Sequence, residues 1–409
     1  MAATVNPPRG MRDLLPAEKA KRERALAVIR GVYRAHGFDE IEAPALEEYD
    51  WLHAGLGGDN EKLSFSVLRR GIGPEQLAGA ADVAAVADLG LRYDLTVPLA
   101  RFYATNQAAL PAVFRSVQIG PVWRAERPQK GRYRQFVQCD IDVLGEAGPL
   151  AELELIGATW AALAALGVEG ASVRINDRRI LTRLLQTWGV AGDRGQQALI
   201  TIDKLDKIGV AGVIGELAEQ GVPTAGLDAA FAQLAAAGWD LLVDPPAWLD
   251  ADAYGDLLAL RDALPDLPLV FDPTLVRGMG YYTGTIFEIA HPSSSSSLGG
   301  GGRYDGMIGR FLGRPVPAVG FSIGFERILD LLPQTEEDAP ATALLHDADV
   351  PLPVLLRAKR EVQQEGGRVR LERARKNRKA QLAALAEEGF TRVAQVTADG
   401  AGPARPLAR

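Results

Sequence analysis

The stretch that most constrains the fold of this chain is residues 119–145, IGPVWRAERPQKGRYRQFVQCDIDVLG. Apolar residues on both sides of its middle, including Val117 and Val122 before it and Ile141 and Val143 after it, predict two buried strands. The connecting loop carries the cations Arg124, Arg127, Lys130, Arg132 and Arg134. Such a hairpin can bind a polyanion, but it can also be a solvated loop, so the rest of the chain must decide.

The composition limits the class of protein. With 409 residues the chain is expected to form two or three domains, because one core rarely exceeds about 250 to 300 residues. Its single cysteine, Cys139, excludes a disulfide framework and a thiolate metal cluster. No apolar run approaches the roughly 18 residues of a membrane span, and the first 15 residues lack a signal-peptide core. We therefore expect a cytoplasmic protein with no membrane partner.

The charge is distributed unevenly along the chain. Residues 351–409 contain 13 Lys and Arg against 6 Asp and Glu, so this tail carries +7 and the rest of the chain, at a net −7 overall, carries −14. A basic tail on an acidic body predicts an anionic partner for the tail. A solvated helix face is the alternative.

Several motifs carry a family resemblance. WRAERP at 123–128 followed by GRYRQF at 131–136 closely resembles motif 2 of class II aminoacyl-tRNA synthetases, in the version found in histidyl-tRNA synthetases. RGMRDLLP at 9–16, with the helix expected over 17–36 and the strand after it, resembles motif 1, which builds the dimer interface in that family. VGFSIGFER at 319–327 resembles motif 3.

Two further motifs resemble signatures specific to histidine. The first is RGMGYY at 277–282, in which Gly280 stands where the family usually has a polar residue. The second is LGGGGRYDG at 298–306, in which Arg303, Tyr304 and Asp305 are expected to form the floor of the amino-acid pocket with the glycines. The preceding serines, 293–297, have the low complexity of a flexible segment.

The resemblance implies an α+β fold, in which an antiparallel sheet flanked by helices forms the catalytic domain. We expect its first part at 1–177, a mainly helical insertion at 178–268 and its second part at 269–332. A linker at 333–341 should lead to a small α/β domain at 342–409, similar to the family's anticodon-binding domain.

The ATP-binding residues are also implied by the resemblance. Arg124 would contact the α-phosphate, Glu126 the adenine amino group, and Phe136 would stack on the base. Arg132 and Arg327 would flank the outer phosphates, since the planar guanidinium binds phosphate oxygens in pairs.

One further arginine would take a place that related enzymes give to a metal ion. Arg277 would lie across the α-phosphate from Arg124, so no metal bound by the protein is expected. Mg²⁺ would accompany ATP and bridge its β- and γ-phosphates.

Histidine recognition would use polar residues from three motifs. Asp142 and Tyr282 are the candidates for the imidazole, and Asp94 and Gln138 for the amino group. In the segment 91–98, strand alternation predicts that Arg92, Asp94 and Thr96 share one side. The resemblance adds three more residues around the substrate, Thr96, Tyr281 and Arg277. Arg127 and Gln129 are expected to recognise the acceptor end of the tRNA.

The function that follows is ATP-dependent activation of L-histidine and its transfer to tRNA(His), by a homodimer. The alternative is a synthetase-like regulatory subunit that binds histidine and controls an ATP phosphoribosyltransferase. Such paralogues typically lose the arginines of motifs 2 and 3, which this chain retains. Its four histidines show no metal-binding spacing, which argues against a metal-dependent hydrolase.

Overall fold

The computed structural model describes residues 5–53, 64–128, 132–276, 281–332 and 340–407. The chain divides into two compact units, Met1–Leu332 and Pro333–Arg409. The motifs quoted above all fall within the first unit.

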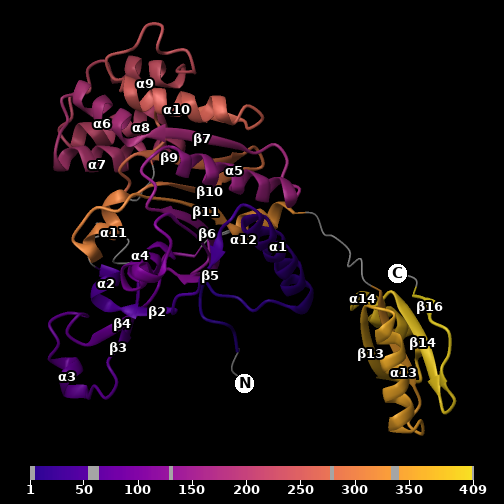
Figure 1. Ribbon diagram of the computed structural model, residues 1–409. Helices are drawn as coiled ribbons and strands as arrows, with labels where there is room; N and C mark the ends of the chain where they lie inside the picture. The colour runs from indigo at the N-terminus through magenta and orange to yellow at the C-terminus, as the bar shows by residue number, and fades with distance from the viewer. Residues whose placement is uncertain (1–4, 54–63, 129–131, 277–280, 333–339, 408–409) are drawn as a thin grey trace. The chain divides into compact units, whose positions relative to one another are not determined.

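The first unit is built on an eight-stranded sheet with the strand order β1-β5-β6-β11-β10-β9-β7-β8. Neighbours pair antiparallel except at the two edges, where β1 pairs parallel with β5 and β8 pairs parallel with β7. The mixed sheet with its helices confirms the expected α+β architecture (Figure 1). The strands are β1 (Asp39–Glu40), β5 (Phe114–Trp123), β6 (Gln135–Leu144), β7 (Ser172–Asp177), β8 (Leu269–Phe271), β9 (Thr285–His291), β10 (Ser294–Arg303) and β11 (Ala318–Gly324).

Helices cover both faces of this sheet. The α-helices of the unit are α1 (Pro16–Ala35), α2 (Tyr49–His53), α3 (Pro74–Ala78), α4 (Thr96–Asn106), α5 (Leu150–Ala165), α6 (Arg178–Thr187), α7 (Asp193–Ile202), α8 (Leu205–Glu219), α9 (Leu227–Ala235), α10 (Ala251–Ala263), α11 (Asp305–Leu312) and α12 (Phe325–Leu331). On one face, Tyr33 of α1 and Leu155 of α5 share a buried cluster with Ile141. On the other, Leu99 of α4 and Ile308 of α11 belong to a second cluster.

The central hairpin confirms the prediction from residues 119–145. Strands β5 and β6 pair along their whole length, from Phe114 opposite Leu144 to Trp123 opposite Gln135. Because side chains alternate along a strand, Cys139, Ile141 and Val143 enter the cluster under α1 and α5. The alternating residues Gln138, Asp140 and Asp142 therefore face the opposite side of the sheet.

The segment 91–98 differs from the sequence prediction. It is not one extended strand: β4 (Ala87–Leu91) ends in a turn, and α4 starts at Thr96. Asp94 accepts a hydrogen bond from the Val97 N–H at 3.1 Å, so its carboxylate stabilises the turn that leads into α4. Arg92 points elsewhere and donates to the carbonyls of Ala43 and Pro121. With β2 (Leu46–Glu48) and β3 (Phe65–Leu68), β4 forms a three-stranded antiparallel sheet.

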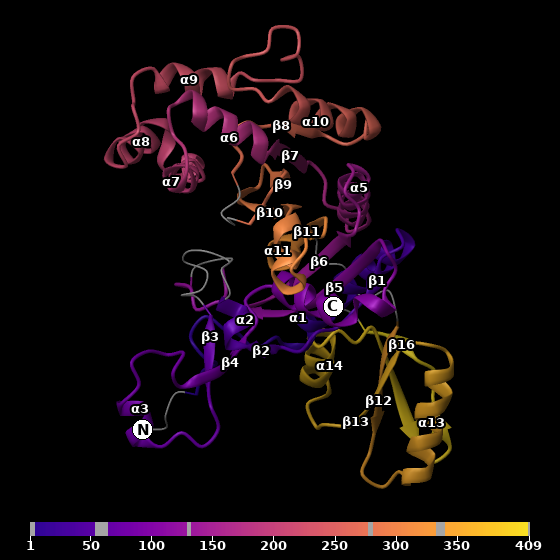
Figure 2. The same cartoon turned by 60° about the vertical axis from the view of Figure 1, so that its left-hand side comes forward.

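Between β7 and β8 the chain is helical, as expected from its periodicity. Helices α6 to α10 gather beside β7 at one end of the unit, whereas the three-stranded sheet and α3 lie at the other end (Figures 1 and 2). Buried side chains of these helices, such as Leu217 and Leu257, belong to the same hydrophobic cluster as the large sheet.

The serine run is not a flexible loop. Ser294–Ser297 opens β10, which pairs with β9 and, from Gly299 on, with β11. The glycines after it are needed because the strands approach closely. A Cβ on Gly301 would lie 1.9 Å from the Gly320 carbonyl oxygen, and one on Gly302 would lie 2.5 Å from the Thr285 carbonyl oxygen.

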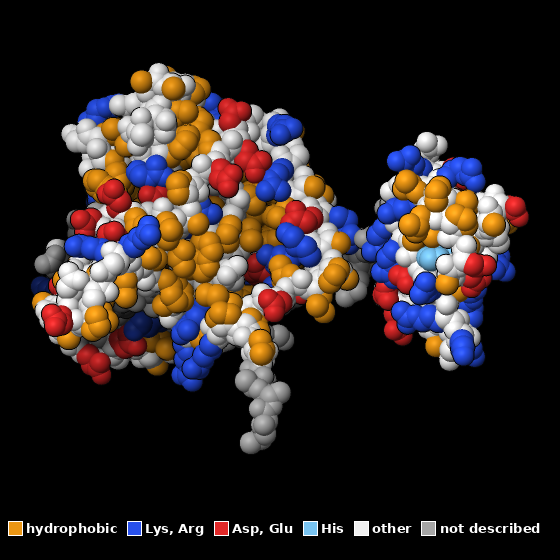
Figure 3. Space-filling model, turned by 90° about the horizontal axis from the view of Figure 1, so that it is seen from below, with side chains coloured by type: hydrophobic (Ala, Val, Ile, Leu, Met, Phe, Trp, Pro, Cys, Tyr) orange, Lys and Arg blue, Asp and Glu red, His pale blue; other side chains and the backbone are white. Residues whose placement is uncertain are grey.

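The second unit confirms the βαβαβ order expected for the tail. Its strand β12 (Ala341–His346) pairs parallel with both β13 (Arg368–Arg373) and β14 (Arg392–Thr397). Helices α13 (Leu352–Gln364) and α14 (Arg378–Glu387) connect them. Two short strands that the sequence did not predict, β15 (Gly400–Ala401) and β16 (Arg405–Pro406), also pair with β14. Lys and Arg side chains are spread over the face of this unit that Figure 3 shows.

Candidate active site

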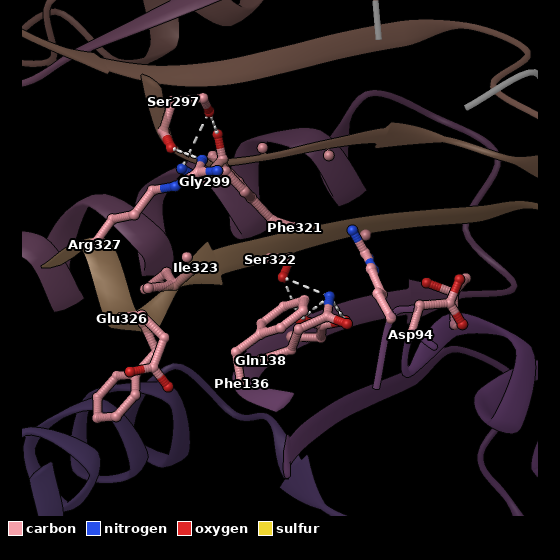
Figure 4. A pocket seen from close by; sticks show the side chains of 18 of the residues that line it. Asp94, Phe136, Gln138, Ser297, Gly299, Phe321, Ser322, Ile323, Glu326 and Arg327 are labelled. Carbon is pink, nitrogen blue, oxygen red and sulfur yellow. Dashed lines mark hydrogen bonds between the residues drawn. The ribbon is translucent and has the colours of Figure 1, made fainter. Parts of the chain in front are cut away.

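A pocket of about 250 Å³ opens on the face of the large sheet that carries Gln138, Asp140 and Asp142. Strands β6, β10 and β11 form its floor, and the β4–α4 turn, the β5–β6 hairpin and the start of α12 form its walls. Figure 4 shows Arg327 and Ser297 at one end and Asp94 at the other, with Gln138 and Ser322 between them.

Three buried carboxyl groups form the acidic end of the pocket, which comprises Asp94, Asp140 and Asp142. Burial raises the pKa of all three, and for Asp142 it reaches about 7. For Asp140 the neighbouring charge of Asp142 is the second cause that raises the pKa. Such a cluster is costly without cations, so the acidic end is suited to a ligand that carries an ammonium or imidazolium group.

Asp142 is bonded to a tyrosine that follows β10. The Tyr304 hydroxyl donates a hydrogen bond to its Oδ1 at 2.6 Å, and this bond lowers the pKa of Asp142 against the larger effect of burial. Tyr281 lies beside Tyr304, with ring centroids 6.0 Å apart, and beside Tyr282 at 4.8 Å. The carboxylate and the three phenols therefore form a polar wall around one small volume.

The guanidinium groups of the pocket belong to Arg124, Arg132 and Arg327. Arg124 donates from Nε to the Tyr93 carbonyl at 2.9 Å, and its guanidinium lies 5.2 Å from the centre of the Phe136 ring. Arg132 is paired with Glu126, and Arg327 donates to the Ser297 carbonyl. These fixed guanidinium groups give the pocket the donors that phosphate oxygens require.

A buried ion-pair network supports the pocket from behind. Glu326 accepts from Nη2 of Arg22 and from Nη2 of Arg12, both at 2.7 Å, and from the Val137 N–H at 3.2 Å. Arg12 also lies 4.2 Å from the centre of the Tyr133 ring. The N-terminal segment is thereby bonded both to α12 and to the motif 2 hairpin, two walls of the pocket.

Most residues singled out from the sequence come together here. The pocket is lined by Asp94, Thr96, Arg124, Glu126, Arg132, Phe136, Gln138, Asp142, Tyr281, Tyr282 and Arg327. Arg127 is exposed and lies outside the pocket lining. Arg277, Gln129 and Gly280 lie outside the described residues.

The expected pocket floor needs two corrections, because Tyr304 lines the pocket but Arg303 and Asp305 do not. Arg303 is buried and pairs with Glu152 of α5 at 2.7 Å and with Asp305 at 3.3 Å. Asp305 also accepts a hydrogen bond from the Ala318 N–H at 2.9 Å. Side chains alternate along the chain at the end of β10, which turns Arg303 and Asp305 to the side opposite Tyr304.

The chain is similar to known proteins over most of its length. The family model described as histidyl-tRNA synthetase matches residues 10–328. A histidine–tRNA ligase from Leifsonia xyli subsp. xyli is 58% identical over 417 aligned residues, which cover 98% of this chain and 97% of the relative. The chain belongs to the histidyl-tRNA synthetase family.

Solved structures of histidyl-tRNA synthetases share this fold. One from Nostoc sp. PCC 7120 matches with a TM-score of 0.78 and 25% identity, over 97% of this chain and 92% of that chain. Another, from Bacillus halodurans, is described as an ATP phosphoribosyltransferase regulatory subunit/histidyl-tRNA synthetase. It matches with a TM-score of 0.76 and 22% identity, over 94% of this chain and 97% of that chain, and this likeness concerns the fold alone.

Two further observations concern metal binding and membrane-spanning helices. Among the described residues no group of three or more His, Cys, Asp or Glu side chains could bind a metal ion. In the same part of the chain, no helix has both the length and the apolar character needed to cross a membrane.

Several pocket residues, among them Asp140, Ser322 and Glu326, were given no specific ligand contact from the sequence. Asp140 and Ser322 lie opposite each other on β6 and β11, and Glu326 precedes Arg327 of motif 3. Alternation along β6 placed Asp140 on the same side as Asp142, which was the available signal for it. No sequence pattern pairs it with Ser322, because the register of β6 against β11 depends on the fold.

Proposed function

We propose that this chain is a histidine–tRNA ligase that converts L-histidine and ATP to histidyl-adenylate and then transfers the histidyl group to tRNA(His). The observation that carries the proposal is a pocket that combines a buried acidic end with fixed guanidinium groups. The acidic end suits the amino group and imidazole of histidine, and the guanidinium groups suit the phosphates of ATP.

The chemistry needs no nucleophile from the protein. A carboxylate oxygen of histidine attacks the α-phosphorus of ATP, and pyrophosphate leaves. In the second step, a hydroxyl of the terminal ribose of the tRNA attacks the acyl carbon, and AMP leaves. Arg124, oriented by the Tyr93 carbonyl, supplies positive charge that is already in place when negative charge builds on the α-phosphate.

ATP is proposed to lie with its base on Phe136 and its amino group near Glu126. Arg132 and Arg327 then contact the outer phosphates. The ion pair between Glu126 and Arg132 orients these two side chains relative to each other. Mg²⁺ enters as part of the substrate, bound to the phosphates of ATP. Arg277 is proposed to face Arg124 across the α-phosphate.

Histidine is proposed to lie with its imidazole between Asp142 and Tyr282. Its ammonium group would then contact Asp94 and Gln138. Thr96 lies near the amino-group contacts, and Tyr281 packs against Tyr282. A site built from such polar partners rejects amino acids that lack them by a factor of about 10⁴ or more, so selection requires no editing domain.

The tRNA and the oligomer extend this proposal beyond the pocket. Arg127 and Gln129 of the hairpin loop are proposed to read the acceptor end, and the domain at 342–409 to bind the anticodon arm. We also propose the domain bounds predicted from the sequence, with catalytic parts at 1–177 and 269–332 and an insertion at 178–268. A homodimer and a cytoplasmic location belong to the same proposal.

The regulatory alternative is not favoured by the relatives, whose names are those of ligases. The retained guanidinium groups argue the same way, since a subunit that only binds histidine does not need them.

The proposal is tested by charging purified tRNA(His) with radiolabelled histidine in the presence of ATP. The full chain should attach histidine, and Arg124→Ala should lower the rate by about 10² to 10³. The matched control is Arg70→Ala, which removes an exposed arginine outside the pocket and should leave the rate unchanged. A full chain that charges no tRNA would contradict the proposal.

A further inference from the structure

Among the described residues, the side-chain amide of Gln138 is hydrogen-bonded through its nitrogen and not through its oxygen. Its Nε2 donates to Ser322 Oγ at 3.1 Å and lies 3.3 Å and 3.4 Å from the two carboxylate oxygens of Asp140 (Figure 4). The Ser322 hydroxyl in turn donates to Asp140 Oδ1. The residues form a small network on neighbouring strands, because Asp140 and Ser322 are paired across β6 and β11.

This network determines which way the amide points. An amide carries donors on its nitrogen and acceptors on its oxygen, and the orientation follows from the neighbours. The Ser322 hydroxyl donates its proton to Asp140, so when Asp140 is ionised, as a bound ammonium group favours, both neighbours at this side of the amide accept hydrogen bonds. Turning the amide of Gln138 would place its oxygen against two acceptors, so Nε2 must stay where it is.

The other end of the amide is left facing the pocket. Gln138 Oε1 is buried and has no hydrogen-bond partner among the described residues, and the same is true of Asp94 Oδ2. Both residues line the pocket. Two buried acceptors without a donor are costly unless a ligand provides one.

We propose that Asp140 and Ser322 are positioning residues that fix the amide of Gln138, so that its Oε1 and Asp94 Oδ2 together accept hydrogen bonds from the α-ammonium group of the amino-acid substrate. This inference rests on the proposed function and assigns two residues to it. Asp140 and Ser322 act through Gln138 and do not themselves contact the substrate.

The first test compares two ligands that differ only in the ammonium group. L-Histidine carries it, whereas 3-(imidazol-4-yl)propionate has the same imidazole and carboxylate without it. Binding of each to the full chain is measured by calorimetry. Asp140→Asn preserves the size of the side chain but adds a donor, so Gln138 can turn and present its nitrogen to the ammonium.

Asp140→Asn should therefore weaken histidine binding by about 10- to 100-fold, as expected for lost hydrogen bonds to a charged group. Ser322→Ala should weaken it by a smaller factor, and neither change should affect the propionate. Matched controls are Asp88→Asn and Ser66→Ala, which alter exposed residues of the small sheet. Equal losses for both ligands, or no loss for histidine, would overturn the inference.

A second variant separates positioning from direct contact. A carboxylate accepts hydrogen bonds at both of its oxygens, so Gln138→Glu needs no orienting partner. When this change is combined with Asp140→Asn, the carboxylate introduced in place of the Gln138 amide would accept from the new asparagine amide and still present an oxygen to the ammonium. The double variant should bind histidine within a few-fold of the unaltered chain. If binding stays as weak as in Asp140→Asn alone, Asp140 contacts the substrate itself and the inference is wrong.

These outcomes are distinct from failure of the proposed function. An unaltered chain that neither binds histidine nor exchanges pyrophosphate into ATP with histidine would overturn the function and this inference together. A chain that does both, with Asp140→Asn unchanged, would overturn the inference alone.

Discussion

Gly320 lies directly opposite Asp142 across β11 and β6, and a Cβ on Gly320 would be 2.0 Å from Asp142 Oδ1. The same Cβ would be 3.1 Å from the ring of Tyr304. Glycine at this position therefore gives the carboxylate room to accept the hydrogen bond of the tyrosine.

Gly320→Ala should weaken histidine binding by about 10- to 100-fold, because the methyl group displaces Asp142, the carboxylate that we propose to bind the imidazole. The affinity for ATP should change much less. Equilibrium binding of both ligands checks this. Gly306→Ala in α11 is the matched control, since a Cβ there would meet nothing within 4 Å. Unchanged histidine binding in Gly320→Ala would contradict the assignment of Asp142.

The pH dependence of histidine binding should have a maximum near neutrality. The pKa of Asp142 is raised to about 7, so the free protein holds a proton there below that pH. The free ligand's imidazole takes up a proton below about 6.5. If the complex holds one proton between them, binding requires loss of a proton in acid and uptake of one in base. The affinity should therefore fall on both sides of the maximum.

Two variants test whether Asp142 causes the fall in histidine affinity at alkaline pH. Tyr304→Phe removes a hydrogen bond that lowers the pKa of Asp142, so the alkaline fall in affinity should move to higher pH. Asp142→Asn removes the titrating carboxyl group, so the fall in histidine affinity at alkaline pH should disappear. Dissociation constants measured between about pH 5 and pH 9 decide this, since that range spans both groups. An affinity that does not change with pH would contradict the shared proton.

The buried ion pair behind the pocket should contribute to stability. Arg22 and Glu326 are 5% and 8% exposed, so Glu326→Ala leaves a buried guanidinium without its main partner. We expect a loss of about 3 to 5 kcal/mol in the free energy of unfolding. Glu23→Ala, which removes the exposed partner of Lys19, should cost less than about 1 kcal/mol. Denaturant unfolding measures both, and equal losses would contradict the difference.

The pair also has a defined dependence on pH. Burial would raise the pKa of Glu326, but the hydrogen bond and charge of Arg22 outweigh it and lower that pKa. The carboxylate therefore stabilises the fold above its ordinary pKa of about 4.3, and this contribution is lost as the pH falls through the lower folded-state value. The difference between the unaltered chain and Glu326→Ala should shrink in acid.

The basic tail gives a prediction about tRNA. Ten of the 23 positions from Arg357 to Lys379 are Lys or Arg. If this surface binds the anticodon arm, deletion of residues 340–409 should spare adenylate formation and weaken transfer to tRNA. The tRNA affinity of the full chain should fall with log[salt] at about 0.7 to 0.9 per phosphate contact, and the truncated chain should show a shallower slope. Identical slopes would mean that the arginines are only solvated.

Much of the fold could be predicted because its signals are local. The apolar alternation around Val117 and Ile141 predicted the central hairpin, and helical periodicity predicted α1 and the helices between β7 and β8. The segment around Asp94 was predicted wrongly, because alternation over four residues does not distinguish a strand from a turn entering a helix. The serine run was predicted wrongly because its strand depends on pairing with β9.

The residues of the candidate site also form two groups, those that a local sequence signal predicts and those that only the fold brings together. Residues within quoted motifs, such as Arg124 and Tyr282, could be found from the sequence. The partnership of Asp140 with Ser322, and that of Arg22 with Glu326, join positions 182 and 304 residues apart. Only the register of the strands and the packing of α1 on α12 bring these side chains together, and neither is encoded in a short pattern.

If this pocket forms an adenylate from histidine, the protein should catalyse histidine-dependent exchange of labelled pyrophosphate into ATP. The full chain, without tRNA, should catalyse exchange with L-histidine and not with the other standard amino acids. Exchange should be absent with 3-(imidazol-4-yl)propionate if the ammonium contacts are needed for productive binding. Absence of exchange with histidine, while histidine itself still binds, would show that the pocket does not form the adenylate and would favour a regulatory protein that has kept the fold without the reaction.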